Sequence, residues 1–529
     1  MPLWLLPVLL VLHFWRWGYA YGSGDHDEIL PQLLHALDPG LFAHDPFVQS
    51  QAGAVTVRTV WLGMLHALSW VMPVSAAVFV GYVVSLVAVF VFVYRLGFAL
   101  VPDRLAALGG TVVAAVLLPR WTLGGNGLTS GLFTPSLTAF AFALPALWLY
   151  LDGRRVWAAA LFGAASWFQV LVGIQLVAVL GAAALVLGAL RRDALPTLGE
   201  TVRFGAVFAL VAAPVVVPVM LAPPHPAAAT AELSTFRVLA ELRVPHHYLA
   251  GSFGLGAYAK FGLLVVAGTG ALGWLHRRGR LQHGRFVGCL LALVAAVLVG
   301  AAALTEGVPV LFVAKLQLFK LTVTASLLFA LAVGAAGAFL LQKRAGMRGL
   351  EGVLFDRPAV GWAASLVLLG GTVALAAAGV GRPGALWRPA AYAQSDEAAV
   401  ARWVRAETDR DAVFLVPPSN TTFRMAAHRS VAINFKPTPY QPGAIHHWFG
   451  RLRTAAPAPL PERGGLAFTT ALDSAYHAHS AREWGRVGAA LEADYALVDL
   501  DALREAPAGS AAFRSGRWAV YRLSGGPVE

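Results

Sequence analysis

Apolar runs separated by short polar segments dominate the first 380 residues of the chain. Runs of roughly 18 residues or more can cross a hydrocarbon core of about 30 Å as helices. By this criterion the pattern predicts about eleven transmembrane helices. They are expected near residues 2–21, 73–97, 104–118, 134–151, 155–169, 171–190, 203–222, 259–275, 286–304, 311–341 and 358–380.

The polar segment 22–72, which follows the first apolar run, is expected to lie at the membrane surface. Residues 27–37 predict a short helix with acids at its N-terminus, where the helix dipole favours negative charge. Residues 50–70 mix Val, Leu and Trp with Arg58 and His66, which is typical of an amphipathic helix in the membrane interface. The segment is therefore predicted to carry two interfacial helices.

After residue 380 the pattern changes. An amphipathic helix is expected at 394–407 and a Pro-rich loop at 437–461. Short runs rich in Val and other apolar residues predict strands at 412–417, 429–434, 495–499 and 518–522. Strands mixed with helices indicate a small α/β domain. The predicted fold is thus a polytopic α-helical membrane domain, 1–380, followed by a C-terminal external α/β domain, 381–529.

The composition supports an integral membrane protein. Hydrophobic residues make up 58% of the chain and charged residues 13%, whereas soluble domains have roughly 45–50% and 25%. The net charge of +12 would suggest a nucleic-acid partner in a soluble protein. Within the first 380 residues most arginines lie in short loops between apolar runs, which indicates membrane topology instead, so no nucleic acid is expected. The single cysteine, Cys289, excludes disulfide bonds within the chain.

The basic loops predict the orientation. Five of them fall on one side of the predicted helices, and by the positive-inside rule that side is cytoplasmic. They contain Arg95 and Arg104, Arg154 and Arg155, Arg191 and Arg192, Arg277 to Arg285, and Lys343 to Arg357. The N-terminus is then cytoplasmic, with the first apolar run retained as a transmembrane helix. Segment 22–72, segment 223–258 and the tail 381–529 are expected on the external face.

Acidic residues cluster directly after the first apolar run. Asp25, Asp27 and Glu28, followed by Asp38 and Asp45, are five of only 28 acids in the chain. A positioned carboxylate can take the proton from an acceptor that attacks a sugar carbon, so Asp25, Asp27 and Glu28 are catalytic candidates. Alternatively, Asp25 and Asp27 could hold a divalent metal ion that neutralises a phosphate leaving group. A third interpretation is that these acids only cap the helix at 27–37 and remain solvated.

Basic residues near the predicted membrane boundary are candidates for binding a phosphate. Arg243, His246 and His247 lie close together in segment 223–258. They can bind an anionic head group, although adjacent histidines point in different directions on most backbones and would chelate a metal poorly. Lys320 is expected two to three turns inside the helix at 311–341, where a charge needs a phosphate or an acid such as Glu306 as its partner.

The tail carries a further basic cluster, which we expect to be mainly a solvated face. Its members are Arg424, His428, Arg429, Lys436, His446, His447 and Arg451. Trp448 and Phe449 within it offer aromatic rings that could stack on a sugar.

The chain resembles the GT-C superfamily of integral membrane glycosyltransferases, in an uncharacterised bacterial branch. The resemblance is carried by residues 24–31 (Gly-Asp-His-Asp-Glu-Ile-Leu-Pro), by Asp38-Pro39 and His44-Asp45, and by the segments at 243–247, 414–418 and 428–430. It implies a polyprenyl-phosphate-linked sugar as donor, the bacterial inner membrane as location, and Asp25, then Asp27 or Glu28, at the position of the catalytic acid. In that family basic residues hold the lipid-linked phosphate. The chemistry of Arg243, His246, His247 and Lys320 makes them the candidates.

The sequence therefore predicts transfer of a sugar from a polyprenyl phosphate to an acceptor, a glycan, lipid or protein, on the external face. A transporter or channel, in which Lys320 and Glu306 line a polar pathway, is one alternative. A non-catalytic scaffold for envelope assembly is the other.

Overall fold

The computed structural model describes residues 1–118, 120–190, 197–221, 232–344, 352–357, 359–363, 365–367, 370, 388–439 and 443–523. Among these residues, six helical segments are long and apolar enough to cross a membrane. They are Val74–Leu100, Val170–Ala189, Gly199–Met220, Leu255–Arg277, Gly284–Gly307 and Leu311–Lys343. The chain is thus a helical membrane protein. The count of about eleven spans stays a prediction, and most of the expected span at 358–380 lies outside the described residues.

The described chain divides into two compact units, each assembled from separated segments. The helical unit comprises Met1–Tyr19, Ser75–Val217 and His246–Leu386. The mixed unit comprises Ala20–Val74, Pro218–Pro245 and Trp387–Glu529. The predicted boundary near residue 380 lies close to Trp387, where the chain passes for the last time from the helical unit to the mixed unit. The mixed unit also takes in all of segment 22–72 and part of segment 223–258.

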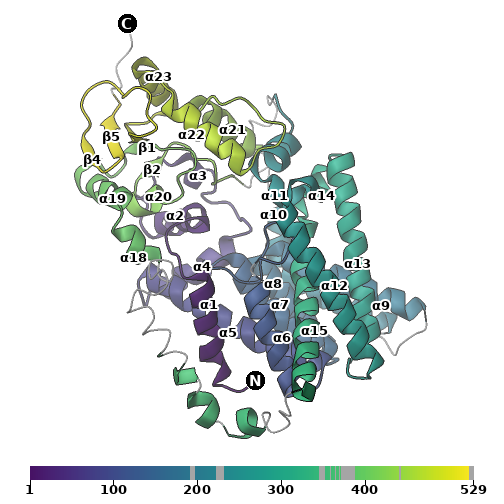
Figure 1. Ribbon diagram of the computed structural model, residues 1–529. Coiled ribbons are helices and arrows are strands. Elements are labelled where there is room, and N and C mark those ends of the chain that lie inside the picture. Colours follow the sequence, from purple (N-terminus) through teal and green to yellow (C-terminus); the bar gives the residue numbers. More distant parts are fainter. Residues whose placement is uncertain are drawn as a thin grey trace. The chain divides into compact units, whose positions relative to one another are not determined.

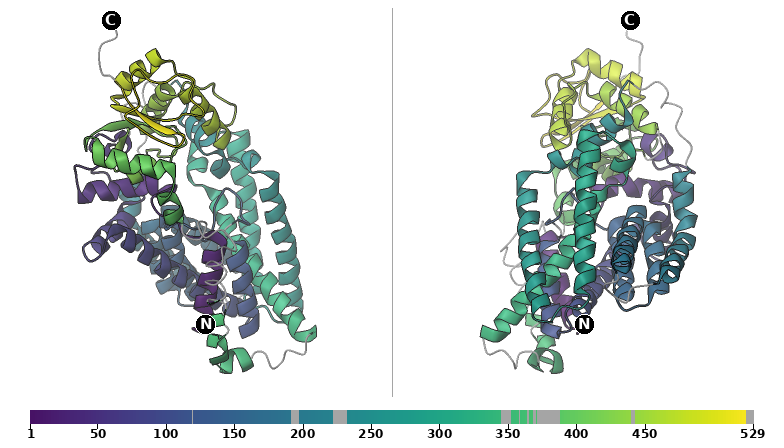
Figure 2. Two further views of the ribbon diagram at one scale, coloured as in Figure 1. Left: turned by 60° about the vertical axis from the view of Figure 1, so that its left-hand side comes forward. Right: turned by 90° about the vertical axis from the view of Figure 1, so that its right-hand side faces the viewer.

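The helical unit is a bundle whose long helices run beside one another (Figures 1 and 2). Its α-helices are α1 (Leu5–Trp17), α5 (Val74–Leu100), α6 (Arg104–Leu117), α7 (Pro135–Leu151), α8 (Arg155–Phe168), α9 (Val170–Ala189), most of α10 (Leu198–Met220), α11 (Pro245–Tyr248), α12 (Leu255–Arg277), α13 (Gly284–Ala302), α14 (Leu311–Lys315) and α15 (Leu321–Arg344). Short 3-10 and π-helical turns are η3 (Ala250–Ser252), η4 (Ala303–Gly307), η5 (Leu318–Lys320) and η7 (Gly352–Asp356).

Small residues allow the closest helix packing in this unit. A Cβ atom added at Gly334 of α15 would lie 2.3 Å from the carbonyl oxygen of Gly109 in α6. One added at Gly109 would lie 2.6 Å from the oxygen of Gly334. Membrane helices gain little from hydrophobic association, so close van der Waals contact between small residues is a main source of their packing energy. The two glycines therefore set the distance between α6 and α15.

The expected single helix at 311–341 is interrupted. It is divided into α14, the turn η5 and α15, and Gln317 has a left-handed backbone with φ of 47°. Gln175 of α9 donates from Nε2 to the carbonyl oxygens of Leu316 (2.5 Å) and Gln317 (3.4 Å). Backbone groups released by a break inside a membrane need such partners, because no lipid group can replace the lost hydrogen bonds. Gln175 therefore stabilises the interruption.

The mixed unit combines the first polar segment with the tail. From the first polar segment it takes α2 (Asp25–Leu37), α3 (Pro46–Gln49) and α4 (Thr59–Ser69), and next along the chain the π-helical turn η2 (Arg237–Arg243). Its remaining helices are α18 (Arg388–Ala393), α19 (Asp396–Glu407), α20 (Phe423–Ala427), α21 (Ala444–Ala455), α22 (Leu466–His477) and α23 (Ala481–Leu491). The expected helices at 27–37, 50–70 and 394–407 correspond to α2, α4 and α19.

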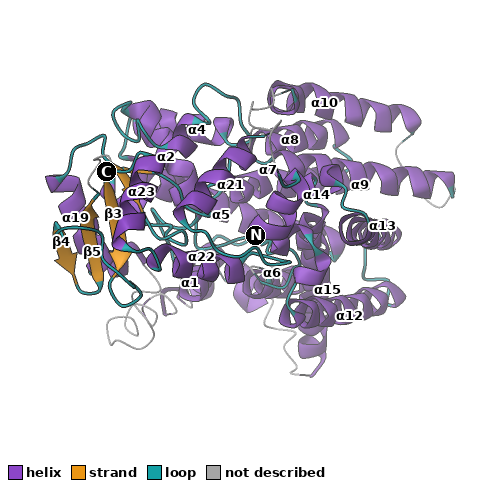
Figure 3. Ribbon diagram, turned by 90° about the horizontal axis from the view of Figure 1, so that it is seen from above, coloured by secondary structure: helices purple, strands orange, loops and turns teal. Residues whose placement is uncertain are grey.

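Five strands form one mixed sheet in the order β2-β1-β3-β5-β4. They are β1 (Val413–Leu415), β2 (Ser430–Val431), β3 (Tyr495–Asp499), β4 (Phe513–Ser515) and β5 (Trp518–Arg522). β1 pairs in parallel with β2 and β3, whereas β5 is antiparallel to β3 and β4. Figure 3 shows β3, β4 and β5 side by side. Four strands were predicted, and β4 was not.

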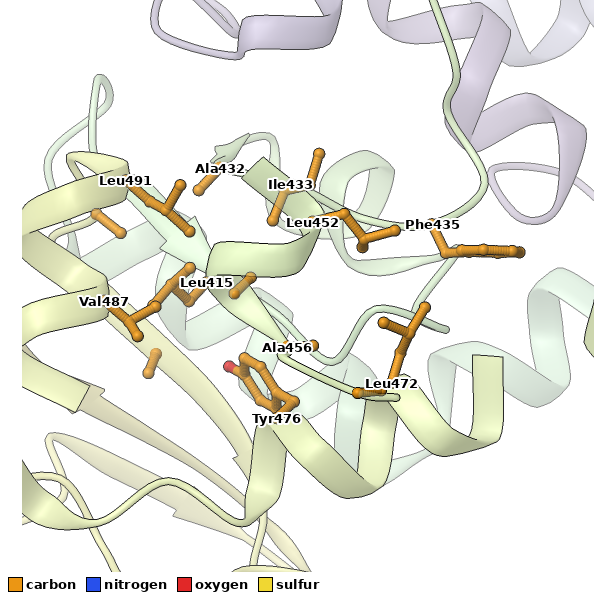
Figure 4. Close-up of a cluster of buried hydrophobic side chains, with 14 of the residues drawn as sticks. Leu415, Ala432, Ile433, Phe435, Leu452, Ala456, Leu472, Tyr476, Val487 and Leu491 are labelled. Carbon is orange, nitrogen blue, oxygen red and sulfur yellow. The ribbon is translucent and has the colours of Figure 1, made fainter. Parts of the chain in front are cut away.

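Alternating residues of the strands enter two different cores. Leu415 and Val498 pack in one cluster with α21, α22 and α23, and Figure 4 shows part of it around Leu415, Leu452 and Tyr476. Phe414 and Leu497 pack in the other with α19 and α20. Successive strand side chains point to opposite faces, so helices cover both faces of this sheet.

The prediction of a Pro-rich loop over 437–461 is wrong where α21 forms. Ile445, Trp448, Phe449, Leu452 and Ala455 are buried along one side of this helix. Their spacing of three and four residues is the helical period. Trp448 and Phe449 lie in the core and so do not offer the sugar-stacking surface that the sequence suggested.

Candidate functional site

The three candidate acids occupy the first turn of α2. The helix starts at Asp25 after Gly24, whose φ of 61° suits a residue without a side chain. No side chain caps this end of the helix through a hydrogen bond. Each of the three carboxylates instead pairs with a different basic side chain of the mixed unit. The capping interpretation therefore does not account for these acids, although their position suits the helix dipole.

Asp27 belongs to a fully buried ionic network. Arg424 of α20 donates from Nη1 to Asp27 Oδ2 (2.9 Å) and from Nε to Asp45 Oδ2 (2.6 Å). The side chains of Arg424, Asp27 and Asp45 are 1%, 1% and 0% exposed. Asn434 donates to Asp27 Oδ2 (3.3 Å), and it accepts from Arg424 Nη2 (3.1 Å). The network joins α2, the start of α3 and the tail.

The electrostatics of the network make Asp27 a structural group. One guanidinium faces two carboxylates, and burial raises the pKa of Asp27 by more than the Arg424 charge lowers it. Asp45 also accepts from the backbone nitrogens of Phe47 (3.1 Å), Val48 (3.2 Å) and Val431 (3.0 Å). These hydrogen bonds fix the start of α3 and the strand β2. The expectation of a solvated basic face is wrong for Arg424.

Glu28 is also engaged inside the unit. Arg58, at the start of α4, donates from Nη2 to Glu28 Oε1 at 2.6 Å. Its Nη1 donates to the backbone oxygen of Glu28 at 3.2 Å. The two side chains are 8% and 11% exposed. This pair fixes α2 against α4.

Asp25 differs from the other two acids because it is partly open to solvent. Its side chain is 44% exposed, and Oδ1 lies 2.6 Å from Nζ of Lys436, which is 30% exposed. Burial would raise the pKa of Asp25, but the charge and hydrogen bond of Lys436 outweigh it and lower the pKa to about 2. Of the three candidates, only Asp25 is an accessible carboxylate that is ionised at neutral pH and paired with an accessible cation.

Arg243 contacts the same tail segment as Asp25. Its Nε donates to Thr438 Oγ1 at 2.8 Å, and its Nη2 donates to the backbone oxygen of Lys436. Its guanidinium also lies 5.0 Å from the ring centroid of Phe435. The predicted catalytic and basic candidates therefore meet at residues 435–438. In the sequence Lys436 is only one member of a basic cluster, and its distance from Asp25 along the chain gives no signal of the pairing.

The pairings do not favour a metal ion at Asp25 and Asp27, because a lysine or arginine already balances each carboxylate. Among the residues that the structure describes, no group of three or more His, Cys, Asp or Glu side chains is arranged to hold a metal.

In the helical unit, His246 and His247 lie against a glycine-rich loop. His247 Nδ1 is 2.5 Å from the carbonyl oxygen of Gly124. A Cβ atom at Gly125, whose φ is +63°, would lie 3.1 Å from His247 and 3.2 Å from His246. The two ring centroids are only 4.3 Å apart. The expectation that these adjacent rings point apart is therefore wrong, because the single turn α11 and the glycine loop bring them together.

Lys320 follows Phe319, a residue that contacts this loop, and it does not lie at the expected depth of a helix. It ends the turn η5, directly before α15, and is not two to three turns inside a continuous helix. Phe319 contacts the loop, since a Cβ atom at Gly124 would lie 2.9 Å from its Cβ. Gln317 donates to the hydroxyl of Tyr248 at 3.2 Å. The structure thus brings the segments of His246, His247 and Lys320 to one polar region of the helical unit, whereas Arg243 belongs to the mixed unit.

Comparisons with known proteins give one family model and two similar structures. Residues 395–455, which include Arg424 and Lys436, match a family described as "Domain of unknown function (DUF6798)". No curated protein matches the sequence. The oligosaccharyltransferase of Archaeoglobus fulgidus in the apo form is similar, with 13% identity, 94% of this chain and 69% of that chain covered, and a TM-score of 0.49.

ArnT from Cupriavidus metallidurans, bound to undecaprenyl phosphate, is similar with 13% identity, 98% and 97% of the two chains covered, and a TM-score of 0.48. Both TM-scores lie below 0.5, so neither similarity assigns a function to this chain.

Proposed function

We propose that this chain is a membrane glycosyltransferase that transfers a sugar from a polyprenyl phosphate to an acceptor on the external face of the bacterial inner membrane. The observation that carries the proposal is Asp25. It is a partly exposed, ionised carboxylate beside an accessible lysine, in a protein rich in membrane helices. The motif around Asp25, at residues 24–31, is also the one through which the sequence resembles GT-C enzymes.

The chemistry assigned to Asp25 is general-base catalysis. The acceptor oxygen or nitrogen forms a bond to the anomeric carbon of the donor, and the bond between that carbon and the phosphate oxygen breaks. The phosphate leaves with the bonding electron pair, and the proton of the acceptor passes to a carboxylate oxygen of Asp25. Asp27 and Glu28 support this site by fixing α2, since both are enclosed by their arginine partners.

Basic and polar side chains are proposed to bind the phosphate of the donor. His246, His247 and Lys320 stay candidates for a phosphate within the helical unit, where the two histidines lie against the loop at Gly124 and Gly125 and Lys320 ends the turn η5. Imidazole and ammonium donors form strong charge-assisted hydrogen bonds to phosphate oxygens. Arg243 contributes by holding the tail segment that carries Lys436.

The variant Asp25→Asn tests the proposal, because it keeps the shape of the side chain and removes its basicity. We expect consumption of lipid-linked sugar by the purified full chain in nanodiscs to fall by about 100-fold or more, as for loss of a general base. The assay uses a panel of undecaprenyl-phosphate-linked hexoses and pentoses and measures the remaining lipid-linked sugar by mass spectrometry. The melting temperature should stay close to that of the wild type.

Asp38→Asn is the matched control. Asp38 is equally exposed, at 44%, and it pairs with Arg410 in the same unit, but it is not part of the proposed site. Its consumption of donor should be unchanged. Full activity of a folded Asp25→Asn variant would rule out the proposed base and favour the non-catalytic scaffold.

A further inference from the structure

We propose that Lys436 is shared between Asp25 and an anionic phosphate group, so that the phosphate of a lipid-linked substrate binds Lys436 by displacing the Asp25 carboxylate. The ion pair in the structure is then the resting state of the site. This inference rests on the proposed function, and it adds a residue and a coupling that the acidic motif alone does not give.

The geometry around Lys436 supports an anion site that Asp25 occupies. The ammonium has its carboxylate partner at 2.6 Å and remains 30% exposed, so a second anion can reach it from solvent. A charge pair with this exposure contributes little stability, because water solvates both groups and screens their attraction. The phosphate diester of a lipid-linked sugar carries one negative charge, as a carboxylate does, and its free oxygens can accept hydrogen bonds from the same ammonium.

Arg243 is the positioning residue of this site. Its two donor nitrogens bind Thr438 and the backbone oxygen of Lys436, and its guanidinium covers the Phe435 ring. These contacts fix the backbone on both sides of Lys436 while leaving the Lys436 side chain to meet Asp25. They also bring a second positive charge to the segment, which favours an incoming anion.

The other positive charges near Asp25 also favour binding of an anion. Arg58 and His26 also lower the pKa of Asp25 through their charge, and Arg58 is balanced by Glu28. The positive charges around Asp25 therefore favour an anion at this position, and Lys436 lies within ion-pair distance of its carboxylate.

The exchange also solves a problem of base strength. A carboxylate with a pKa of about 2, such as Asp25, is a poor proton acceptor, and general bases work best with a pKa nearer the working pH. When Lys436 turns to the phosphate, the Asp25 carboxylate loses its main stabilising charge and becomes more basic. The base would therefore gain strength only when a donor is bound.

A double-mutant cycle on phosphate binding tests the exchange. The full chain in phosphatidylcholine nanodiscs is titrated with undecaprenyl phosphate, and separately with inorganic phosphate. Lys436→Gln should weaken binding of undecaprenyl phosphate by about tenfold, and Lys436→Arg should retain it. Asp25→Asn should strengthen binding by about three- to tenfold, because it removes the competitor. In the Lys436→Gln background the gain from Asp25→Asn should vanish.

Asp38→Asn and Arg410→Gln, the exposed pair elsewhere in the mixed unit, are the controls and should leave binding unchanged. The exchange is wrong if Asp25→Asn leaves binding unchanged or weakens it, or if the gain persists without Lys436. Effects seen only with inorganic phosphate would assign the site to free phosphate and overturn the lipid source. Tighter phosphate binding in an Asp25→Asn variant that still consumes lipid-linked sugar would overturn the proposed base and leave the exchange standing.

Discussion

Arg424 forms two buried ion pairs within the mixed unit. Its guanidinium forms ion pairs with both Asp27 and Asp45, and all three side chains are fully enclosed. Removing one partner of a buried charge pair costs more than the pair itself contributes, because the remaining charge stays buried. Here two carboxylates would remain. Arg424 therefore determines whether the tail can close over α2 and α3.

We expect Arg424→Ala to destabilise the mixed unit by roughly 3–5 kcal/mol. The measurement is thermal and denaturant unfolding of the full chain in detergent, followed by tryptophan fluorescence. Arg410→Ala is the control, since Arg410 is 56% exposed in its pair with Asp38 and should cost only about 0–1 kcal/mol. Similar losses for both variants would contradict the structural role given to Arg424.

Asp27 should make stability depend on pH in a defined direction. Burial raises its pKa above the ordinary 3.8, so the folded state holds this proton more tightly than the unfolded state. The stabilisation from the proton is complete below 3.8 and is lost as the pH rises through the raised native pKa. Asp27→Asn lacks this loss. Its melting temperature relative to the wild type should therefore rise across that window and stay constant at higher pH. A gap that is constant, or that narrows with rising pH, would show that the pKa of Asp27 is not raised.

At this scale the sequence showed which side chains could do chemistry but not which of them meet. The acids of α2 were found because acids are scarce in the chain. Their partners lie far away in sequence: Arg424 is separated from Asp27 by 397 positions and from Asp45 by 379. Composition around Arg424 and Lys436 indicated only a basic face. The contacts that distinguish the buried Arg424 from the accessible Lys436 arise from the tertiary fold.

Elements with a strong period were predicted well. Apolar runs gave α5, α9 and α13, and the strand patterns gave β1, β3 and β5. The misses had two causes. Segment 437–461 was predicted as a loop because it contains prolines and several His and Arg residues. The apolar residues of α21 nevertheless recur with a clear helical period. The break at Gln317 had no local signal, because neither Pro nor Gly marks it. The residue that donates to its free carbonyl oxygens, Gln175, lies on another helix.

The close contact of α6 and α15 gives a prediction for a single helix pair. Gly334→Ala places a Cβ atom 2.3 Å from the oxygen of Gly109, so the helices must move apart, at a cost of about 1–3 kcal/mol. Gly337→Ala is the matched control on the same helix, because nothing lies within 4 Å of its Cβ position. That change should be neutral or stabilise the helix by up to about 1 kcal/mol. Unfolding of the two variants in detergent measures the difference, and equal effects would contradict the packing.

For the whole molecule, the mixed unit is built from three stretches of chain that are far apart in sequence. Ala20–Val74, Pro218–Pro245 and Trp387–Glu529 form one compact body. Segments of one body must lie on one side of a membrane, so the loops before α5, before α11 and after residue 386 share a side. The basic loops independently predict that 22–72, 223–258 and the tail lie on the external face. The compact mixed unit and the distribution of basic loops thus place the same three segments together.

The accessibility of introduced cysteines tests on which side of the membrane the mixed unit lies. Cys289 is the only native cysteine, so Cys289→Ala gives a background without thiols. Ser510→Cys places a thiol at an exposed site of the mixed unit, and Gln282→Cys places one at an exposed site between α12 and α13. If the basic loops are cytoplasmic, a membrane-impermeant maleimide should label Ser510→Cys in intact spheroplasts. It should label Gln282→Cys only after the membrane is permeabilised. The reverse pattern would invert the orientation and place Asp25 and Lys436 on the cytoplasmic face, where an externally presented acceptor could not reach them.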